Sequence, residues 1–428
     1  MSSNKLNIFQ QLVRHWDTVH PYNAGQVMRL RGRADVRAWR DAWLESLDVL
    51  GLGRTTVRGK HYHHEILNGT ADQHGLVVLL EHASLHEFIS TEMNRPFDAA
   101  CDCPFRPFLL QESDTFNIGL IYQHWVADSA SVRTVLHDWF LRVFDRASAR
   151  TTPLRCPPGG YLSVFSPDRA KWRFGEGLLS SARWTSRFRR VRRVESKGFG
   201  DFRVRFESHT APPGTIERVS RFARSRQVKV NDVFLTAMAE VIERHVPLSR
   251  QFRRQDVALG TIVDLRPFVK EDLSDVFGLF LGFTSVVCRP QHFADFDTLL
   301  NGVSAQTDLH RRTRAALASP FRMSFGLAAA RFVGRDPKKV TSFYRKRLPL
   351  AGGISNVNLN RTWVTRFHPD PILDYLRISP TGPMMPLVLT PSTIGDTLNL
   401  GVTRRHSVVN DELAGKVVED FLARLANL

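Results

Sequence analysis

The chain has 428 residues, of which 43% are hydrophobic and 24% are charged, the composition of a globular protein large enough for two domains. No apolar run reaches the length of about eighteen residues that a transmembrane helix needs, and the N-terminal residues lack the apolar core of a secretory signal. We therefore expect a cytoplasmic protein. Lys and Arg number 59 against 42 Asp and Glu, and the net charge of +17 favours acidic or phosphorylated partners.

The apolar pattern predicts strands and helices that alternate without a regular βαβ rhythm. In chain order, short β-branched or aromatic runs predict strands over residues 116–122, 257–263 and 283–288. Apolar residues at helical spacing predict helices that follow Ser131, begin near Val230 and run from Leu413. Mixed sheets are therefore expected rather than a doubly wound parallel sheet. The best candidate for a domain boundary is the stretch 151–205, which opens with Pro and Gly and continues rich in Arg.

The stretch 121–131 (IYQHWVADSAS) contains the residues that are best suited to catalysis. A strand is expected to end just before His124, and a helix is expected to start just after Asp128. Loops at the ends of strands are where a rigid scaffold presents catalytic groups. A neutral imidazole at this place can take a proton from a hydroxyl or an amine as that group attacks a thioester carbonyl.

The surroundings of this H-x-x-x-D pair resemble the CoA-dependent acyltransferase superfamily. That group includes condensation domains of peptide synthetases, wax ester synthase-like enzymes and chloramphenicol acetyltransferases. Four further matches occur in the expected order: Pro96-Phe97-Asp98, Val230-Asn231-Asp232, Val263-Asp264-Leu265-Arg266-Pro267 and Gly353-Ile354-Ser355-Asn356. Ordered matches from residue 96 to residue 356 are far more specific than the His-Asp pair alone.

The resemblance implies an α/β fold of two chloramphenicol acetyltransferase-like lobes, arranged in a V around a central tunnel. The expected limits are 1–165 for the N-terminal lobe, 166–205 for a basic crossover and 206–428 for the C-terminal lobe. The tunnel would carry the phosphopantetheine arm of CoA or of an acyl carrier protein to the histidine, and an alcohol or amine acceptor would enter from the opposite side. No permanently bound cofactor and no metal are expected, and a monomer suffices.

The resemblance also assigns roles to individual residues. His124 would be the general base, and Asp128 would pair with Arg266 to brace the catalytic loop. Ser355 and Asn356 become candidates for the tunnel wall or for donating a hydrogen bond to the oxyanion, an effect worth about 3 kcal/mol when it is well placed. Gln123 and Ser129 are further candidates for these roles at the oxyanion or the tunnel.

Two positions depart from the superfamily's His-His-x-x-x-Asp-Gly motif. Gln123 replaces the first histidine, which is commonly structural, and Ser129 replaces the glycine. A loop that needs a positive φ or a close backbone approach would be strained by serine, so we expect Ser129 to reshape the tunnel or to mark altered chemistry. A catalytically inactive relative that recruits an acidic carrier protein is therefore the alternative to an enzyme.

Other signals have simpler interpretations. The lone pair Cys101 and Cys103 and the group His61, His63 and His64 lack the spacing of a zinc site, and a strand explains the histidines. The stretch His20-Pro21-Tyr22-Asn23 fits either a turn into the first strand or the lining of an acceptor channel. The aromatic and Arg-rich stretch 172–193 fits a linker helix, a contact to a carrier protein or CoA, or contact with a membrane surface. No nucleic-acid-binding motif is found.

Overall fold

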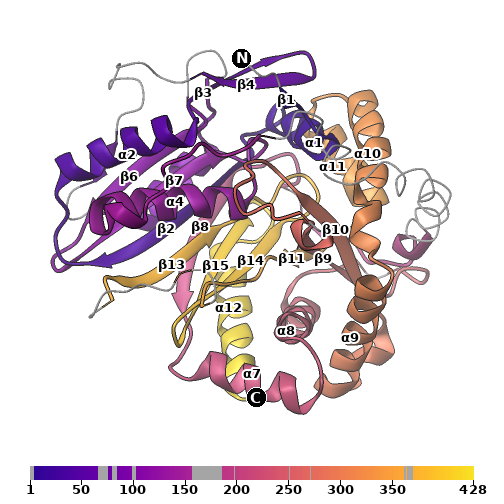
Figure 1. Ribbon diagram of the computed structural model, residues 1–428. Coiled ribbons are helices and arrows are strands. Elements are labelled where there is room, and N and C mark those ends of the chain that lie inside the picture. Colours follow the sequence, from indigo (N-terminus) through magenta and orange to yellow (C-terminus); the bar gives the residue numbers. More distant parts are fainter. Residues whose placement is uncertain are drawn as a thin grey trace. The chain divides into compact units, whose positions relative to one another are not determined.

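The computed structural model describes residues 4–65, 76–79, 84–98, 103–156, 186–196, 198–249, 251–269, 271–360, 363 and 370–428 (Figure 1). The chain divides into two compact units, and each is described by itself. Unit 1 comprises Met1–Lys171, Asp264–Leu281 and Thr365–Leu376, and unit 2 comprises Trp172–Val263, Gly282–Val364 and Arg377–Leu428. Unit 1 therefore contains two segments from the C-terminal half of the chain, which no sequence pattern indicated.

Unit 1 is built on a five-stranded sheet in the order β13-β2-β7-β6-β5, with a small sheet β1-β4-β3 beside it. Its strands are β1 (Asn4–Lys5), β2 (Asn23–Arg31), β3 (Arg54–Arg58), β4 (His61–Glu65), β5 (Val77–Leu79), β6 (Phe105–Gln111), β7 (Thr115–Gln123) and β13 (Ile372–Ile378). The central strand β7 pairs antiparallel with β2 and β6, and its last residue, Gln123, lies opposite Asn23.

The helices of unit 1 are α1 (Ile8–Asp17), α2 (Val36–Leu50), α3 (Leu85–Asn94) and α4 (Ser129–Phe144), with short 3₁₀ turns η2 (Arg146–Ser148) and η3 (Arg266–Phe268). Helices α2 and α4 pack on each other and against one face of the sheet (Figure 1). The rings of Trp39 and Trp139 meet edge to face at 5.5 Å, and the buried indole N–H of Trp139 donates to the Trp39 carbonyl at 2.8 Å. This tightly packed core fixes the direction of α4, and hence of the loop before it.

Unit 2 is built on a seven-stranded sheet with the path β10-β9-β11-β14-β15-β8, and β12 pairs with β14. Its strands are β8 (Val204–Thr210), β9 (Val257–Asp264), β10 (Leu281–Cys288), β11 (Gly352–Ile354), β12 (Val357–Asn358), β14 (Leu387–Ile394) and β15 (Thr397–Arg405). The pairs β9/β11 and β11/β14 are parallel, whereas β14/β15 and β15/β8 are antiparallel. In unit 1 the pair β5/β6 is parallel, so both units combine helices with mixed sheets, and the predicted mixed-sheet α/β class is confirmed.

The helices of unit 2 are α7 (Thr215–Ser225), α8 (Val230–His245), α9 (Phe296–Arg312), α10 (Ser319–Val333), α11 (Pro337–Arg347) and α12 (Asp411–Ala426), with 3₁₀ turns η4 (Pro290–Ala294) and η5 (Ala315–Ala318). Helix α8 packs between α9 and α12 (Figure 1). It lies so close to β11 that a Cβ on Gly352 would meet the Met238 side chain at 2.5 Å. The Asp232 carboxylate of α8 accepts hydrogen bonds from the Lys229 N–H at 3.1 Å and the Thr307 hydroxyl at 2.8 Å, so the motif that begins at Val230 starts the helix and ties it to α9.

The three helices and three strands predicted from the sequence are confirmed as α4, α8 and α12 and as β7, β9 and β10. The predicted lobe limits stay a prediction, because residues 166–185 of the expected crossover lie outside the described residues. Within the described ranges, no helix combines the length and the apolar character that a membrane span needs.

Candidate functional site

The loop between β7 and α4 carries the candidate catalytic residues. Strand β7 is buried along its whole length except at its first residue and ends at Gln123, and α4 begins at Ser129. The five residues between them, 124–128, are therefore held between a central strand and a helix that packs in the core of unit 1. A loop with both ends fixed in this way can hold a side chain in one orientation.

The imidazole of His124 is held by contacts on several sides. The ring nitrogen Nδ1 lies 3.1 Å from the Ala127 carbonyl oxygen, and the backbone N–H of His124 donates to the Tyr22 carbonyl at 3.2 Å. The Tyr22 ring stacks on the imidazole at 5.8 Å and 5°, and the Tyr122 ring meets it edge-on at 5.9 Å and 89°. The stretch around Tyr22 thus forms the turn into β2 and also contacts the imidazole of His124.

The Ala127 carbonyl determines which nitrogen of His124 can act as a base. A carbonyl oxygen only accepts hydrogen bonds, so Nδ1 must carry the hydrogen in the neutral ring. The lone pair of the neutral imidazole then lies on Nε2. A histidine in this tautomer is prepared to receive a proton at Nε2 without rearranging its contact to Ala127.

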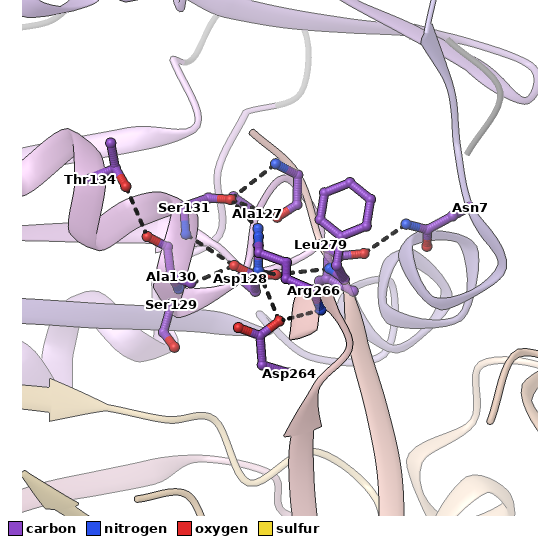
Figure 2. Close-up of polar contacts among 12 residues, drawn as sticks. Asn7, Ala127, Asp128, Ser129, Ala130, Ser131, Thr134, Asp264, Arg266 and Leu279 are labelled. Atoms are coloured by element: carbon purple, nitrogen blue, oxygen red, sulfur yellow. Dashed lines mark hydrogen bonds and ion pairs between the residues drawn. The ribbon is translucent and has the colours of Figure 1, made fainter. Parts of the chain in front are cut away.

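Asp128 closes the loop and is completely buried. Figure 2 shows its polar contacts. One carboxylate oxygen caps α4 by accepting from the Ala130 and Ser131 N–H groups at 3.1 and 3.0 Å. The other accepts from Arg266 Nη1 and from the Phe280 N–H, both at 2.8 Å. All four contacts suit a carboxylate, so Asp128 acts as a structural anchor.

The pKa of Asp128 follows from these contacts. Burial alone raises it, because a carboxylate loses its hydration. The positive charge and the hydrogen bond of Arg266, together with the N–H groups of Phe280 and Ser131, outweigh burial and hold the pKa below its ordinary value. Asp128 therefore stays ionised over the neutral range.

Arg266 joins the loop to the segment that follows β9. Besides Asp128, it donates to the Ser131 hydroxyl at 2.8 Å, and its Nη1 lies 3.3 Å from the Asp264 carboxylate (Figure 2). Its guanidinium also lies 4.9 Å from the centre of the Phe280 ring. The pairing of Asp128 with Arg266 that the family resemblance implies is thus present, and both residues belong to unit 1.

The backbone of residues 278–280 completes the network. The Gly278 carbonyl accepts from the Asp128 N–H at 3.0 Å and from the Ser131 hydroxyl at 2.9 Å, and the Gly278 N–H donates back to that hydroxyl at 3.1 Å. The Asn7 side chain donates to the Leu279 carbonyl at 2.7 Å (Figure 2). Sequence reasoning missed Ser131, Asn7 and this backbone, and no local signal marks them because the partners are 147 to 272 positions apart.

Ser129 has no positive φ, so the backbone strain expected there is absent, while a reshaped tunnel or altered chemistry stays a prediction. Ser129 is the first residue of α4, and among the described non-glycine residues only Gln227 and Arg314 have a positive φ. Its carbonyl accepts from the Gln26 side chain at 2.8 Å. The position that does need glycine is Gly278, where φ is 151° and a Cβ would lie 3.0 Å from the Phe280 ring.

Gln123, which replaces the first motif histidine, joins a second brace on the other side of His124. Its side-chain amide donates to one oxygen of Asp17 at 3.3 Å, and the Tyr22 N–H donates to the other at 2.8 Å. Burial raises the pKa of the half-buried Asp17 above its ordinary value, although the Tyr22 N–H, Arg14 and Gln123 lower it in part. The end of α1 is thereby tied to the residues that flank the histidine.

The remaining predicted residues lie elsewhere. Ser355 and Asn356 follow β11 in unit 2, where the Ser355 N–H donates to the Leu389 carbonyl at 3.0 Å. Their roles at the oxyanion or the tunnel stay a prediction. In the Arg-rich stretch, Phe188 is buried, whereas Trp172, Phe174, Leu178, Leu179 and Trp184 lie outside the described residues.

The histidine cluster forms strand β4, as expected. His64 is half-buried there, and burial lowers its pKa to about 4, so its ring is neutral near pH 7. In the part of the chain that the structure describes, no group of three or more His, Cys, Asp or Glu side chains is arranged to hold a metal ion.

Known structures share this fold although their sequences differ strongly. No protein-family model and no curated protein matches the sequence. The structure of trichothecene 15-O-acetyltransferase from Fusarium sporotrichioides matches with a TM-score of 0.70 at 13% identity, covering 99% of this chain and 95% of that chain. The first condensation domain of the calcium-dependent antibiotic synthetase, in complex with a substrate analogue, matches with a TM-score of 0.67 at 14% identity and covers 99% and 95%.

A third match is the structure of the X-domain in complex with OxyB from teicoplanin biosynthesis, with a TM-score of 0.60, 16% identity and coverage of 99% and 93%. The chain therefore has the fold that condensation domains share with CoA-dependent acyltransferases. This is the class that the sequence motifs resemble.

Proposed function

We propose that the protein is an acyltransferase that moves an acyl group from a thioester to an alcohol or an amine, with His124 as the general base. The observation that carries the proposal is the hydrogen bond between His124 Nδ1 and the Ala127 carbonyl. It leaves the basic lone pair on Nε2, in a loop that is anchored by the buried pair of Asp128 and Arg266.

The reaction balances with these groups alone. The acceptor oxygen or nitrogen bonds to the thioester carbonyl carbon while its proton passes to His124 Nε2. The tetrahedral intermediate collapses, the carbon–sulfur bond breaks, and the departing sulfur takes the proton from the imidazolium. The products are an ester or an amide and a free thiol, and His124 returns to its neutral form. Ser355 and Asn356 remain the candidates for stabilising the oxyanion.

The donor in this proposal is a phosphopantetheine thioester, held on CoA or on an acyl carrier protein. The net charge of +17 favours an acidic donor in both cases, because complementary charge speeds the encounter. If the donor is a carrier protein, added salt should raise the apparent KM for it. If added salt leaves the apparent KM unchanged, the preference for a carrier-protein donor is removed.

The test is detection of acyl transfer by intact mass. The protein is incubated with acyl-CoA and acyl-carrier donors and with pooled alcohols and amines. His124→Ala should lower the rate by at least about a hundredfold, while His61→Ala, on an exposed histidine of β4, should leave the rate unchanged. Equal turnover in His124→Ala and the wild type would refute the mechanism.

The second candidate is a module without catalytic activity that recruits a partner. It is favoured by the departures at Gln123 and Ser129 and by the likeness to the X-domain, whose structure is a complex with OxyB. It predicts equal capture of an acyl carrier protein by the wild type and His124→Ala, with no turnover of any donor in the panel. Turnover that depends on His124 would exclude it.

A further inference from the structure

The net positive charge of the chain is concentrated in two stretches. Residues 311–347 contain eleven Lys or Arg and one acidic residue, Asp336. Residues 183–205 contain nine Lys or Arg and two acidic residues. These two stretches together account for the whole excess of +17, and the rest of the chain is balanced. A concentration of this kind generates a local field that evenly scattered charges do not produce.

The two basic stretches lie side by side in unit 2. The Thr341 hydroxyl of α11 donates to the Phe199 carbonyl at 2.8 Å, and the Arg345 guanidinium lies 4.4 Å from the centre of the Phe199 ring. Arg187 donates to the side chain of Gln306 on α9. The stretch 186–205 therefore contacts α9 through Arg187 and α11 through Phe199.

Helix α10, between these elements in sequence, presents large apolar side chains to solvent. The described residues include five exposed large apolar side chains, of which four belong to unit 2: Phe252, Leu309, Phe325 and Phe332. Phe332 is 94% exposed and Phe325 is 55% exposed. They are seven positions apart, which places them on the same side of the helix, two turns from each other.

Two exposed arginines lie near one of these aromatic side chains in the sequence. Ala328 lies exposed between Phe325 and Phe332, and Arg331 and Arg335 lie exposed beside Phe332. We call these five residues, Phe325, Ala328, Arg331, Phe332 and Arg335, the α10 surface. It combines protruding aromatic rings with cations, and α10 itself contains no acidic residue.

We propose that the α10 surface binds the surface of an anionic lipid bilayer. Stable attachment to a membrane needs two signals, apolar side chains that enter the interface and basic side chains that attract anionic headgroups, and the region supplies both. A side chain that protrudes as far as Phe332 would need a matching pocket on a protein partner, whereas a fluid lipid layer accommodates it without one. This proposal is independent of the acyltransferase proposal.

The experiment is flotation of the full chain with phosphatidylcholine vesicles that contain or lack phosphatidylserine. We expect binding only to the vesicles with phosphatidylserine and release by salt, because the headgroup attraction is screened. Arg331→Glu with Arg335→Glu should lower the partition coefficient at least about tenfold, since each basic side chain near the surface contributes about fivefold. Phe325→Ser with Phe332→Ser should lower it several-fold.

A matched charge reversal controls for net charge. Arg37→Glu with Arg40→Glu changes two exposed arginines on α2 of unit 1 and should leave lipid binding nearly unchanged. Melting curves of all variants verify that the fold is retained. The proposal is overturned if the vesicles do not bind, or if the α2 and α10 variants lose binding equally. Binding of an acidic protein or a single-stranded nucleic acid at this surface, with no lipid binding, would also overturn it.

Discussion

Two carboxylates brace the loop of His124 from its two sides, and they differ in the charge of their partners. Asp128 is completely buried, yet its pKa is lowered, because Arg266 and two N–H groups stabilise the anion. At Asp17 burial raises the pKa, and the groups that oppose it, the neutral Tyr22 N–H, the charge of Arg14 and the neutral Gln123 amide, offset that rise only in part. Burial raises the pKa of both carboxyls, and only at Asp128 does a cation in direct contact help to outweigh it.

The comparison also separates two ways of holding a loop. The Asp128 side is an ion pair inside a network with several members, and removing any partner leaves a charge or a polar group without compensation. The Asp17 side consists of neutral hydrogen bonds, for which an uncharged amide can substitute. We expect the first side to be sensitive to substitution and the second to be tolerant.

The largest effect is expected from Arg266→Met. It leaves the carboxylate of Asp128 buried without its cation, which costs about 3–5 kcal/mol of unfolding free energy. Adding Asp128→Asn should restore part of this loss, because the unpaired charge is then gone. Urea unfolding monitored by tryptophan fluorescence measures both variants.

The control for this experiment is an exposed ion pair in the same unit. Arg29 and Glu112 lie 2.7 Å apart with side chains 46% and 37% exposed. Arg29→Met should cost no more than about 1 kcal/mol, since exposed pairs contribute little. If Arg266→Met costs no more than Arg29→Met, the buried pair does not support the loop.

The next largest effect is expected from Gly278→Ala. The positive φ and the clash with the Phe280 ring together should cost about 1–3 kcal/mol and should displace the carbonyl that holds Asp128 and Ser131. Gly59→Ala is the matched variant, because Gly59 also has a positive φ, of 62°, but its Cβ would meet nothing within 4 Å. Thermal and urea unfolding should give the larger loss for Gly278→Ala; equal losses would show that the Phe280 contact relaxes freely.

Gly278 also shows which parts of this site could be predicted from the sequence and which could not. Helix α4 and strand β7 were predictable from apolar spacing, so the loop with His124 and Asp128 could be located. The positive φ of this network lies at Gly278 and not at Ser129, in a backbone stretch that meets Ser131 from 147 positions away in the sequence. Patterns in a single sequence report local periodicity. They do not indicate that the Gly278 carbonyl, far away in the sequence, accepts hydrogen bonds from Asp128 and Ser131.

The same limit applies to the brace at Asp17 and to the α10 surface. Nothing near Gln123 in the sequence indicates that its partner is a carboxylate at the end of α1. The net charge was visible from composition, but only the contacts of Phe199 with α11 bring its two sources together. In both cases the missing information is a tertiary contact, which no propensity or spacing contains.

The smallest effect is expected from Asp17→Asn. The amide oxygen can still accept from the Tyr22 N–H, and its NH₂ group can turn toward the Gln123 oxygen, so the unfolding free energy at pH 7 should change by less than about 1 kcal/mol. The dependence on pH is more informative than this change. Because the folded-state pKa of Asp17 lies above the ordinary value of 3.8, the folded protein binds the proton more tightly than the unfolded chain does.

The contribution of Asp17 to stability is therefore greatest at acid pH, and it declines as the pH rises from the ordinary pKa through the raised one. Wild-type stability relative to Asp17→Asn should fall over that window, which lies above 3.8. For Asp128 the sign is opposite: its contribution is fully present above the ordinary pKa of 3.8 and is lost only as the pH falls through the lowered value. Urea unfolding of the wild type and both Asn variants at a series of pH values checks the two signs. A wild-type advantage over Asp17→Asn that grows with pH would mean that Arg14 or another cation stabilises the Asp17 anion, and the contrast between the two carboxylates would then be lost.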